Sequence, residues 1–199
     1  MLENPKTYQY LLGKNLEDEM EKEMGNQQER LKLDLAWLGG VIDGEGTFTL
    51  RIHGRKRNKL LITPVFSITN TDFVITDNIE RILKENDIPF WVTYVSNEAH
   101  PKWKPKKEIV NMGVRRLSKF IPVILPYLVG KEEEAKIVCE FCDRRLKMLG
   151  NRSYYTKEDI ELVTRVKALH GHSQGENNFK ILNDYTLNIC KNEDIVCSE

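Results

Sequence analysis

The chain has 199 residues, of which 40% are hydrophobic and 30% carry a charge. This composition is too apolar for a disordered chain and favours one domain with appendages. The longest apolar run, residues 120–130, contains Pro122 and Pro126 and is too short and too interrupted for a membrane helix. The first residues lack the basic and apolar pattern of a leader peptide. We therefore expect an intracellular protein without a membrane partner.

The charged residues are segregated along the chain, although 30 basic and 30 acidic side chains give a net charge of zero. Residues 1–46 hold 5 basic and 10 acidic side chains, a net of −5, whereas residues 47–119 hold 14 and 7, a net of +7. A basic middle segment favours a surface that faces a polyanion. A solvated patchwork of charges is the alternative.

The elements can be predicted in chain order. Residues 1–28 are polar and acidic and predict an exposed helix or a loose arm. From Leu31 apolar residues recur at helical spacing as far as Ile42, and the following G-E-G ends the helix. Two strands, at residues 47–53 and 60–69, form a hairpin, and an amphipathic helix follows at residues 72–86.

A second pair of strands is expected at residues 90–96 and 108–114. Three helices follow: residues 115–128, interrupted by Pro122, residues 131–149, and residues 156–169, which open with a T-K-E-D cap. The order is αββαββαα(α). It predicts an α+β protein, with an αββαββα core in which helices cover one face of a four-stranded antiparallel sheet. We expect this core over residues 29–170, between an N-terminal extension at 1–28 and a C-terminal extension at 171–199.

The stretch Leu38–Gly46, which reads L-G-G-V-I-D-G-E-G, is the part of the sequence that points to chemistry. Each of two adjacent glycines inside a helix costs up to about 1 kcal/mol relative to alanine. Such a cost is tolerated where two backbones approach closely. Asp43 and Glu45 place negative charge at the C-terminal end of the helix dipole, which is the unfavourable end. Departures of this kind from helix propensity and from the preferred charge at a helix end are typical of functional sites.

This stretch resembles the motif of the LAGLIDADG homing endonucleases, often written L-A-G-x-I-D-G-E-G. The chain departs from the usual spelling at Gly39, where relatives usually carry alanine. The resemblance extends to the order of elements over residues 31–170. It implies a DNA-binding sheet and a site-specific endonuclease that cleaves both strands of a long pseudo-palindromic site by metal-dependent phosphodiester hydrolysis, leaving short 3′ overhangs.

The resemblance also implies an active site. Glu45 matches the motif acid that ligates the metal, and the backbone carbonyl of Gly44 assists it. Asn70, at the end of a strand, matches a polar residue that orders water, and Lys131 matches a basic residue near the scissile phosphate. An ordinary exposed charge is the alternative for Lys131. The oxygen ligands favour Mg²⁺, with Mn²⁺ able to substitute.

One copy of the motif is present, and relatives bring two motif helices together, so the resemblance implies a homodimer. The expected interface consists of Leu35, Leu38, Gly39, Gly40, Ile42 and Asp43. Strand alternation then predicts a polar face that meets about 20 base pairs of double-stranded DNA. The candidate DNA contacts are Thr47, Thr49, Arg51, His53, Arg55, Arg57, Lys59, Thr63, Ser67, Lys104 and Lys106. Leu61 and Val65 share this face and contact either thymine methyl groups or the protein itself.

The sequence is also compatible with other functions. The family also contains RNA maturases, whose partner is host intron RNA, and relatives that bind DNA without cleaving it. The presence of Glu45 favours cleavage. A zinc site could form at Cys139 and Cys142 with His170 and His172, but a single C-x-x-C pair favours buried free cysteines. For a nuclease used in intron homing, we expect a location at DNA in the cytoplasm, nucleoid or organelle matrix.

Overall fold

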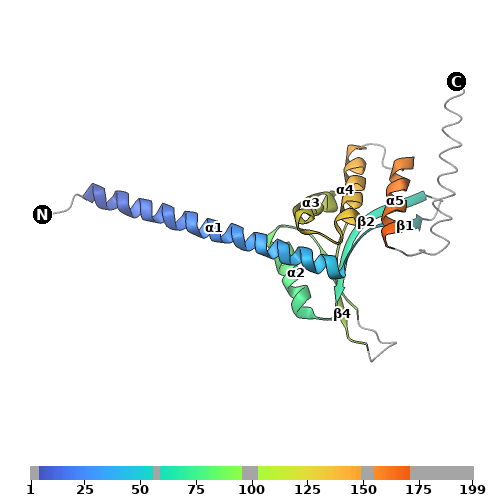
Figure 1. The fold of residues 1–199 in the computed structure, drawn as a ribbon, viewed down its shortest axis with the longest axis horizontal. Helices are drawn as coiled ribbons and strands as arrows, with labels where there is room; N and C mark the ends of the chain where they lie inside the picture. The colour runs from blue at the N-terminus through green and yellow to red at the C-terminus, as the bar shows by residue number, and fades with distance from the viewer. Residues whose placement is uncertain (1–4, 56–58, 96–102, 149–154, 171–199) are drawn as a thin grey trace, which may run out of the picture. The chain divides into compact units, whose positions relative to one another are not determined.

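The structure is a computed structural model that describes residues 5–55, 59–95, 103–148 and 155–170. Its elements are drawn in chain order in Figure 1. They are α1 (Pro5–Glu45), β1 (Gly46–Arg55), β2 (Lys59–Asn70), α2 (Phe73–Glu85), β3 (Trp91–Val95), β4 (Lys106–Met112), α3 (Val114–Ile124), the 3₁₀ helix η1 (Leu125–Tyr127), α4 (Glu132–Lys147) and α5 (Lys157–Leu169). The predicted order of helices and strands is confirmed.

The four strands form one antiparallel sheet in the order β1-β2-β4-β3. β1 pairs with β2 over its whole length, from Gly46 opposite Ile68 to Arg55 opposite Lys59. β4 pairs with β2 only from Val65 onward. The first half of β2 therefore has a strand neighbour on one side only, which leaves room beside it where β4 has ended.

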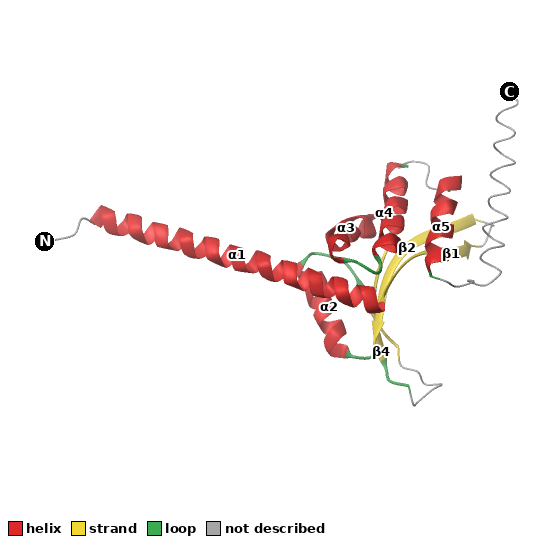
Figure 2. Ribbon diagram, viewed as in Figure 1, coloured by secondary structure: helices red, strands yellow, loops and turns green. Residues whose placement is uncertain are grey.

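One face of the sheet carries the core. Phe48, Leu50 and Ile52 alternate along β1 and are at most 8% exposed. The rings of Phe48 and Phe66 lie 5.0 Å apart, and Phe120 of α3 packs 4.9 Å from Phe66. Figure 2 shows α3, α4 and α5 on one side of the strands. The predicted α+β layout, with helices on one face of a four-stranded antiparallel sheet, is confirmed.

Short-range signals set several helix ends. The side chain of Thr156 accepts the N–H of Asp159 and the Asp159 side chain accepts the N–H of Thr156, which forms the predicted capping box of α5.

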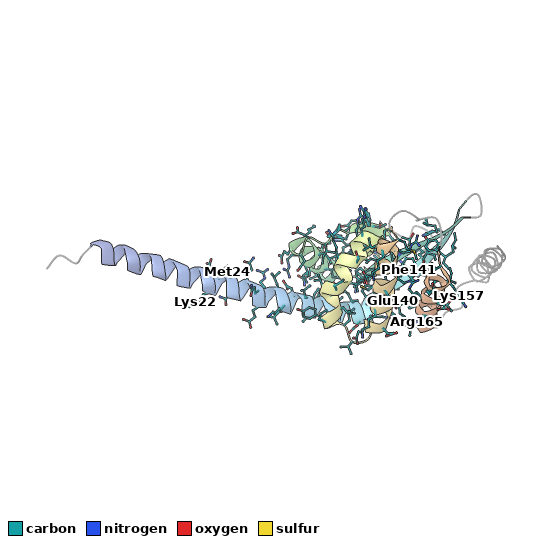
Figure 3. The ribbon with its side chains drawn as sticks, turned by 90° about the horizontal axis from the view of Figure 1, so that it is seen from above. Lys22, Met24, Glu140, Phe141, Lys157 and Arg165 are labelled. Carbon is teal, nitrogen blue, oxygen red and sulfur yellow. The ribbon has the colours of Figure 1, made fainter. Side chains whose placement is uncertain are left out.

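Between helices, Glu140 of α4 and Arg165 of α5 form an ion pair at 3.7 Å, and both side chains are labelled in Figure 3. Pro122 was expected to interrupt α3, but the helix continues through it to Ile124 and ends in η1.

The first helix differs most from its prediction. Instead of a separate arm and a motif helix, one α-helix runs from Pro5 to Glu45. The chain divides into two compact units, Met1–Trp37 and Leu38–Glu199, so this helix contributes to both. The predicted core boundary at residue 29 stays a prediction. Within the described ranges, no helix is both long and apolar enough to cross a membrane.

Candidate active site and nucleic-acid interface

The motif helix ends where its last acid reaches the sheet. A side chain at Gly46 would place its Cβ 2.7 Å from the backbone oxygen of Ile42, so only glycine fits the step from α1 into β1. Glu45, the last residue of α1, is exposed, and so is Gly44. The carboxylate that was predicted to hold the metal therefore stands at the junction of helix and sheet.

Asp43 has a different environment, because its two carboxylate oxygens accept backbone N–H groups of the segment before α4. Oδ2 accepts from Val129 and Oδ1 accepts from Lys131, both at 2.8 Å. Partial burial acts to raise the pKa of Asp43, but the N–H donors of residues 129–131 and the Lys131 charge outweigh it. The pKa therefore lies below the ordinary aspartate value, and Asp43 acts as a structural acceptor.

Through this contact Asp43 ties the motif helix to Lys131. Lys131 is the N-cap residue of α4, and its side chain is 27% exposed. Its Nζ donates to Oε1 of Glu134 at 3.4 Å. Glu134 is buried, and its Oε1 also lies 3.6 Å from Nε2 of His170. Two carboxylates thus constrain Lys131, Asp43 through its backbone and Glu134 through its side chain.

The oxygen atoms at the helix end fit a hard divalent cation. Within the ranges described, no ion pair or hydrogen bond engages the side chain of Glu45, so its oxygens can accept a metal. No group of three or more histidine, cysteine, aspartate or glutamate side chains is assembled for a metal among these residues.

Asn70 ends β2, as predicted, and is half-buried. Its Oδ1 accepts the N–H of Asp72 at 2.8 Å, and Asp72 in turn caps α2 by accepting the N–H of Val74 at 2.9 Å. The turn therefore uses the amide oxygen of Asn70. The role of Asn70 in ordering water stays a prediction.

The face of the sheet opposite the core is polar. The predicted DNA contacts that alternate onto this face are Thr47, Thr49, Arg51 and His53 of β1, with Thr63 and Ser67 of β2. Arg51 and His53 are exposed, and Arg51 pairs in register with Thr63. Val65 lies in the same register series but is only 1% exposed, which supports packing against the protein. Leu61 is half-buried.

The basic residues around the start of β4 divide between the two faces of the sheet. Lys104 and Lys106 are exposed and line a cavity of about 380 Å³ with Trp103. Lys107 points to the other face, is 3% exposed, and pairs with Asp77 and Glu80 of α2. Three of the predicted DNA contacts cannot be located in the structure. The side chains of Arg55 and Lys59 and the whole of Arg57 lie outside the described residues.

The structure corrects part of the predicted dimer interface. Leu38 and Ile42 are 0% exposed within the single chain, so their side chains belong to its own core. Gly39 is also buried, and a Cβ there would lie 2.4 Å from the backbone oxygen of Tyr127. Close approach to η1, rather than to a second chain, explains this glycine. A Cβ at Gly40 would meet nothing within 4 Å, so Gly40 remains a candidate for the interface.

The sequence did not single out three charged residues, Glu134, Arg115 and Arg116. Glu134 looked like one acid in a solvated E-E-E run, and only its burial singles it out. Arg115 and Arg116 were treated as the start of a helix, but both are exposed in the first turn of α3. The signal in the sequence that could have identified Arg115 and Arg116 is their position at the N-terminal end of a helix, which is the positive end of its dipole.

The cysteines favour the expectation of free thiols over a zinc site. Cys139 and Cys142 are free, and burial raises the pKa of the Cys142 thiol, which disfavours the thiolate that zinc binds. His170 lies beside Glu134 instead. Cys190, Cys197 and His172 lie outside the described residues.

No protein-family model matches the sequence, and no curated protein matches it either. Solved structures do match. The homing endonuclease I-CvuI, in a complex with the I-CreI target in the presence of Mg in which the DNA is not cleaved, has a TM-score of 0.60 and 21% identity over 79% of this chain and 97% of its own. The archaeal intron-encoded homing endonuclease I-Vdi141I, complexed with DNA, has a TM-score of 0.59 and 17% identity over 78% of this chain and 98% of its own.

A third structure, the homing endonuclease I-TnaI, has a TM-score of 0.55 and 15% identity over 76% of this chain and 97% of its own. The chain therefore shares its α+β fold with these homing endonucleases. The chain has the fold of the LAGLIDADG homing endonucleases.

Proposed function

We propose that the chain is a LAGLIDADG homing endonuclease, a site-specific enzyme that cleaves both strands of a long DNA site. The observation that carries the proposal is the link from the motif helix to α4. Asp43 fixes the backbone of Lys131. Glu45, two residues after Asp43, is exposed, and among the described residues no ion pair or hydrogen bond engages its carboxylate. An acid and a cation brought to one end of an open polar sheet are suited to phosphodiester hydrolysis.

Glu45 and the backbone carbonyl of Gly44 would hold Mg²⁺, because both supply the oxygen ligands that this cation prefers. Mn²⁺ has the same ligand preference and should substitute. When bound, the cation lowers the pKa of a bound water and neutralises charge on the leaving oxygen. One chain offers one such carboxylate, which leaves the ligand set to be completed by a second chain and by phosphate oxygens.

Lys131 and Asn70 would act on the phosphate and on the attacking water. The Nζ of Lys131 has three donors, so it can keep its bond to Glu134 and still stabilise negative charge on a phosphate oxygen. The amide oxygen of Asn70 is engaged by Asp72, which leaves its NH₂ group to orient water. The cleaved ends should carry short 3′ overhangs, as the resemblance implies.

We propose that the active form is a homodimer. The chain holds one motif, and the three fold relatives are matched over 97% or 98% of their own length, so each corresponds to a single chain of this size. Gly40 and Gly44 lie four residues apart on α1 and are exposed, which gives a smooth surface where a second helix can approach. Leu35 is only 9% exposed in the single chain, so of the predicted set Gly40 and Asp43 stay in the proposed interface.

The sheet sets the length of the DNA site. β1 has 10 residues, and at about 3.3 Å per residue such a strand spans roughly 33 Å. With base pairs about 3.4 Å apart, each protomer would cover roughly nine or ten pairs and the dimer about 20. The two half-sites should be related by approximate two-fold symmetry, because each meets the same side chains. Such an enzyme would act at DNA inside the cell and support intron homing.

Cleavage of a randomised DNA library tests the proposal. The purified chain is incubated with the library and Mg²⁺, and the cleaved ends are sequenced. We expect one long site with short staggered 3′ overhangs and no cleavage in EDTA. Binding of a discrete site without cleavage would instead identify a non-cleaving relative, and cleavage without sequence preference would exclude homing.

A further inference from the structure

The guanidinium of Arg116 lies over an aromatic ring beside the polar face of the sheet. Its guanidinium carbon lies 4.1 Å from the ring centroid of Trp91. Trp91 is 43% exposed and ends the cross-strand row formed by Thr47, Ser67, Val110 and Trp91. Arg116 comes from the first turn of α3, so this pair extends the polar face with a cation that no strand supplies.

Among the described residues, ion pairs do not explain the two arginines at the start of α3. Within the described part of the chain, neither Arg115 nor Arg116 has an ion-pair partner, whereas Arg144 and Arg145 both pair with Asp159. The first turn of α3 also contains no acid. Basic side chains at the positive end of a helix are unfavourable for folding, so an external anion would stabilise them.

A cavity opens beside these arginines. It has a volume of about 490 Å³, and its lining includes Leu61, Met112, Arg115, Arg116, Arg145 and Tyr155. Leu61 and Met112 belong to the register rows of the polar face, at the place where β4 has ended and β2 continues. The arginines therefore border open space at the flank of the sheet.

We propose that Trp91 and Arg116, with Arg115 beside them, bind a phosphate of the DNA backbone at the flank of the sheet. The inference rests on the proposed function, because it assumes that DNA lies on the polar face. A guanidinium stacked on an indole keeps its N–H edge free, and that edge matches two oxygens of one phosphate. The contact with the ring positions the guanidinium before DNA arrives. A contact of this kind holds the duplex in register and does not read its sequence.

A salt titration of DNA binding tests the site without knowledge of the target. The probe is a fluorescent 30-base-pair duplex pool of random sequence, measured by anisotropy in EDTA between 50 and 300 mM KCl (roughly the range in which phosphate contacts change affinity most). Arg116→Ala should reduce the slope of log K against log salt by about 0.9 per protomer and weaken binding. The matched control is Lys136→Ala on α4, which removes the same charge from a residue paired with Glu132 at 2.6 Å. It should leave the slope unchanged.

Two further variants separate charge from stacking. Arg116→Lys keeps the charge but loses the planar fork, so the slope should stay and the affinity should fall. Trp91→Ala should also keep the slope and lose affinity, and Trp91→Phe, which keeps an aromatic face, should restore most of it. Circular dichroism of each variant confirms the fold. If Trp91→Ala does not fold, the Arg116 and Trp91→Phe variants decide.

The outcomes distinguish this inference from the proposed function. If the wild-type chain does not bind the duplex pool, the proposed function fails. The control Lys136→Ala should keep the slope and affinity of the wild type. If the wild type binds and Arg116→Ala also keeps both, the phosphate site is overturned and the proposed function stands. Once a cleavage site is known, Arg116→Ala should weaken all sequence variants equally. A loss confined to one base position would assign Arg116 to base reading and overturn the proposal.

Discussion

Oδ1 of Asp43 accepts the backbone N–H of Lys131 at 2.8 Å, across 88 residues of sequence. The other oxygen of Asp43 accepts the N–H of Val129. The first acid of the motif is thus engaged by the fold, whereas the last acid, Glu45, is exposed, as its proposed role as a metal ligand requires. Two acids that look alike in the sequence have different surroundings because Asp43 contacts the segment before α4.

Asp43→Asn should destabilise the chain by about 1–3 kcal/mol, because an NH₂ group would replace one acceptor and leave a backbone N–H unsatisfied. The pKa of Asp43 lies below its ordinary value, so its carboxylate contributes stability above the pKa of the unfolded chain. That contribution is lost as pH falls through the folded pKa, below about pH 4. Urea unfolding between pH 7 and pH 3 measures it. The difference in free energy between wild type and variant should shrink in acid, and a constant difference would contradict the assignment.

Glu45→Gln should abolish DNA cleavage while specific binding survives or tightens slightly. The substitution keeps the size of the side chain but removes the charge that would hold Mg²⁺. It also removes two carboxylates of a dimer from beside the phosphates, which relieves repulsion. Because Glu45 is exposed and unengaged, thermal unfolding should be unchanged. Gel-shift and cleavage assays on one target DNA measure binding and cleavage separately. Cleavage by the variant near the wild-type rate would show that Glu45 is not an active-site residue.

The two motif glycines should respond differently to substitution. Gly39→Ala should lower the stability of the chain by about 1–3 kcal/mol, since its Cβ would meet the Tyr127 backbone. Gly40→Leu should fold normally but dimerise poorly, because the bulky side chain would keep the second helix away. Thermal unfolding and analytical ultracentrifugation separate the two effects. A well-behaved dimer of Gly40→Leu would place the interface elsewhere.

The sequence was sufficient for the fold but not for all of the site. Alternation at Phe48, Leu50 and Ile52 predicts a strand with one buried face, and the T-K-E-D cap predicts the start of α5, because both signals are local. The contact of Gly39 with Tyr127 could not be predicted, because it depends on where η1 packs. The same holds for Glu134, whose burial depends on the packing of its helix within the folded chain.

Arg51→Ala should weaken specific binding by about 1–3 kcal/mol per half-site and relax the preference at one mirrored pair of positions. Arg51 is exposed on the polar face and lies opposite Thr63 in the register. Binding to a set of single-base variants of the cleavage site measures both effects. If all variants weaken equally, Arg51 contacts phosphate instead of a base edge.

Lys131→Met should slow cleavage less than Glu45→Gln does, because it removes one stabilising charge but leaves the metal ligand. It should also lower the free energy of unfolding. The Nζ of Lys131 lies 3.4 Å from the buried carboxylate of Glu134, which would lose this charged partner in the variant. Urea unfolding of the wild type and of Lys131→Met measures the loss. Equal free energies of unfolding in the two proteins would show that Lys131 does not compensate the buried charge of Glu134.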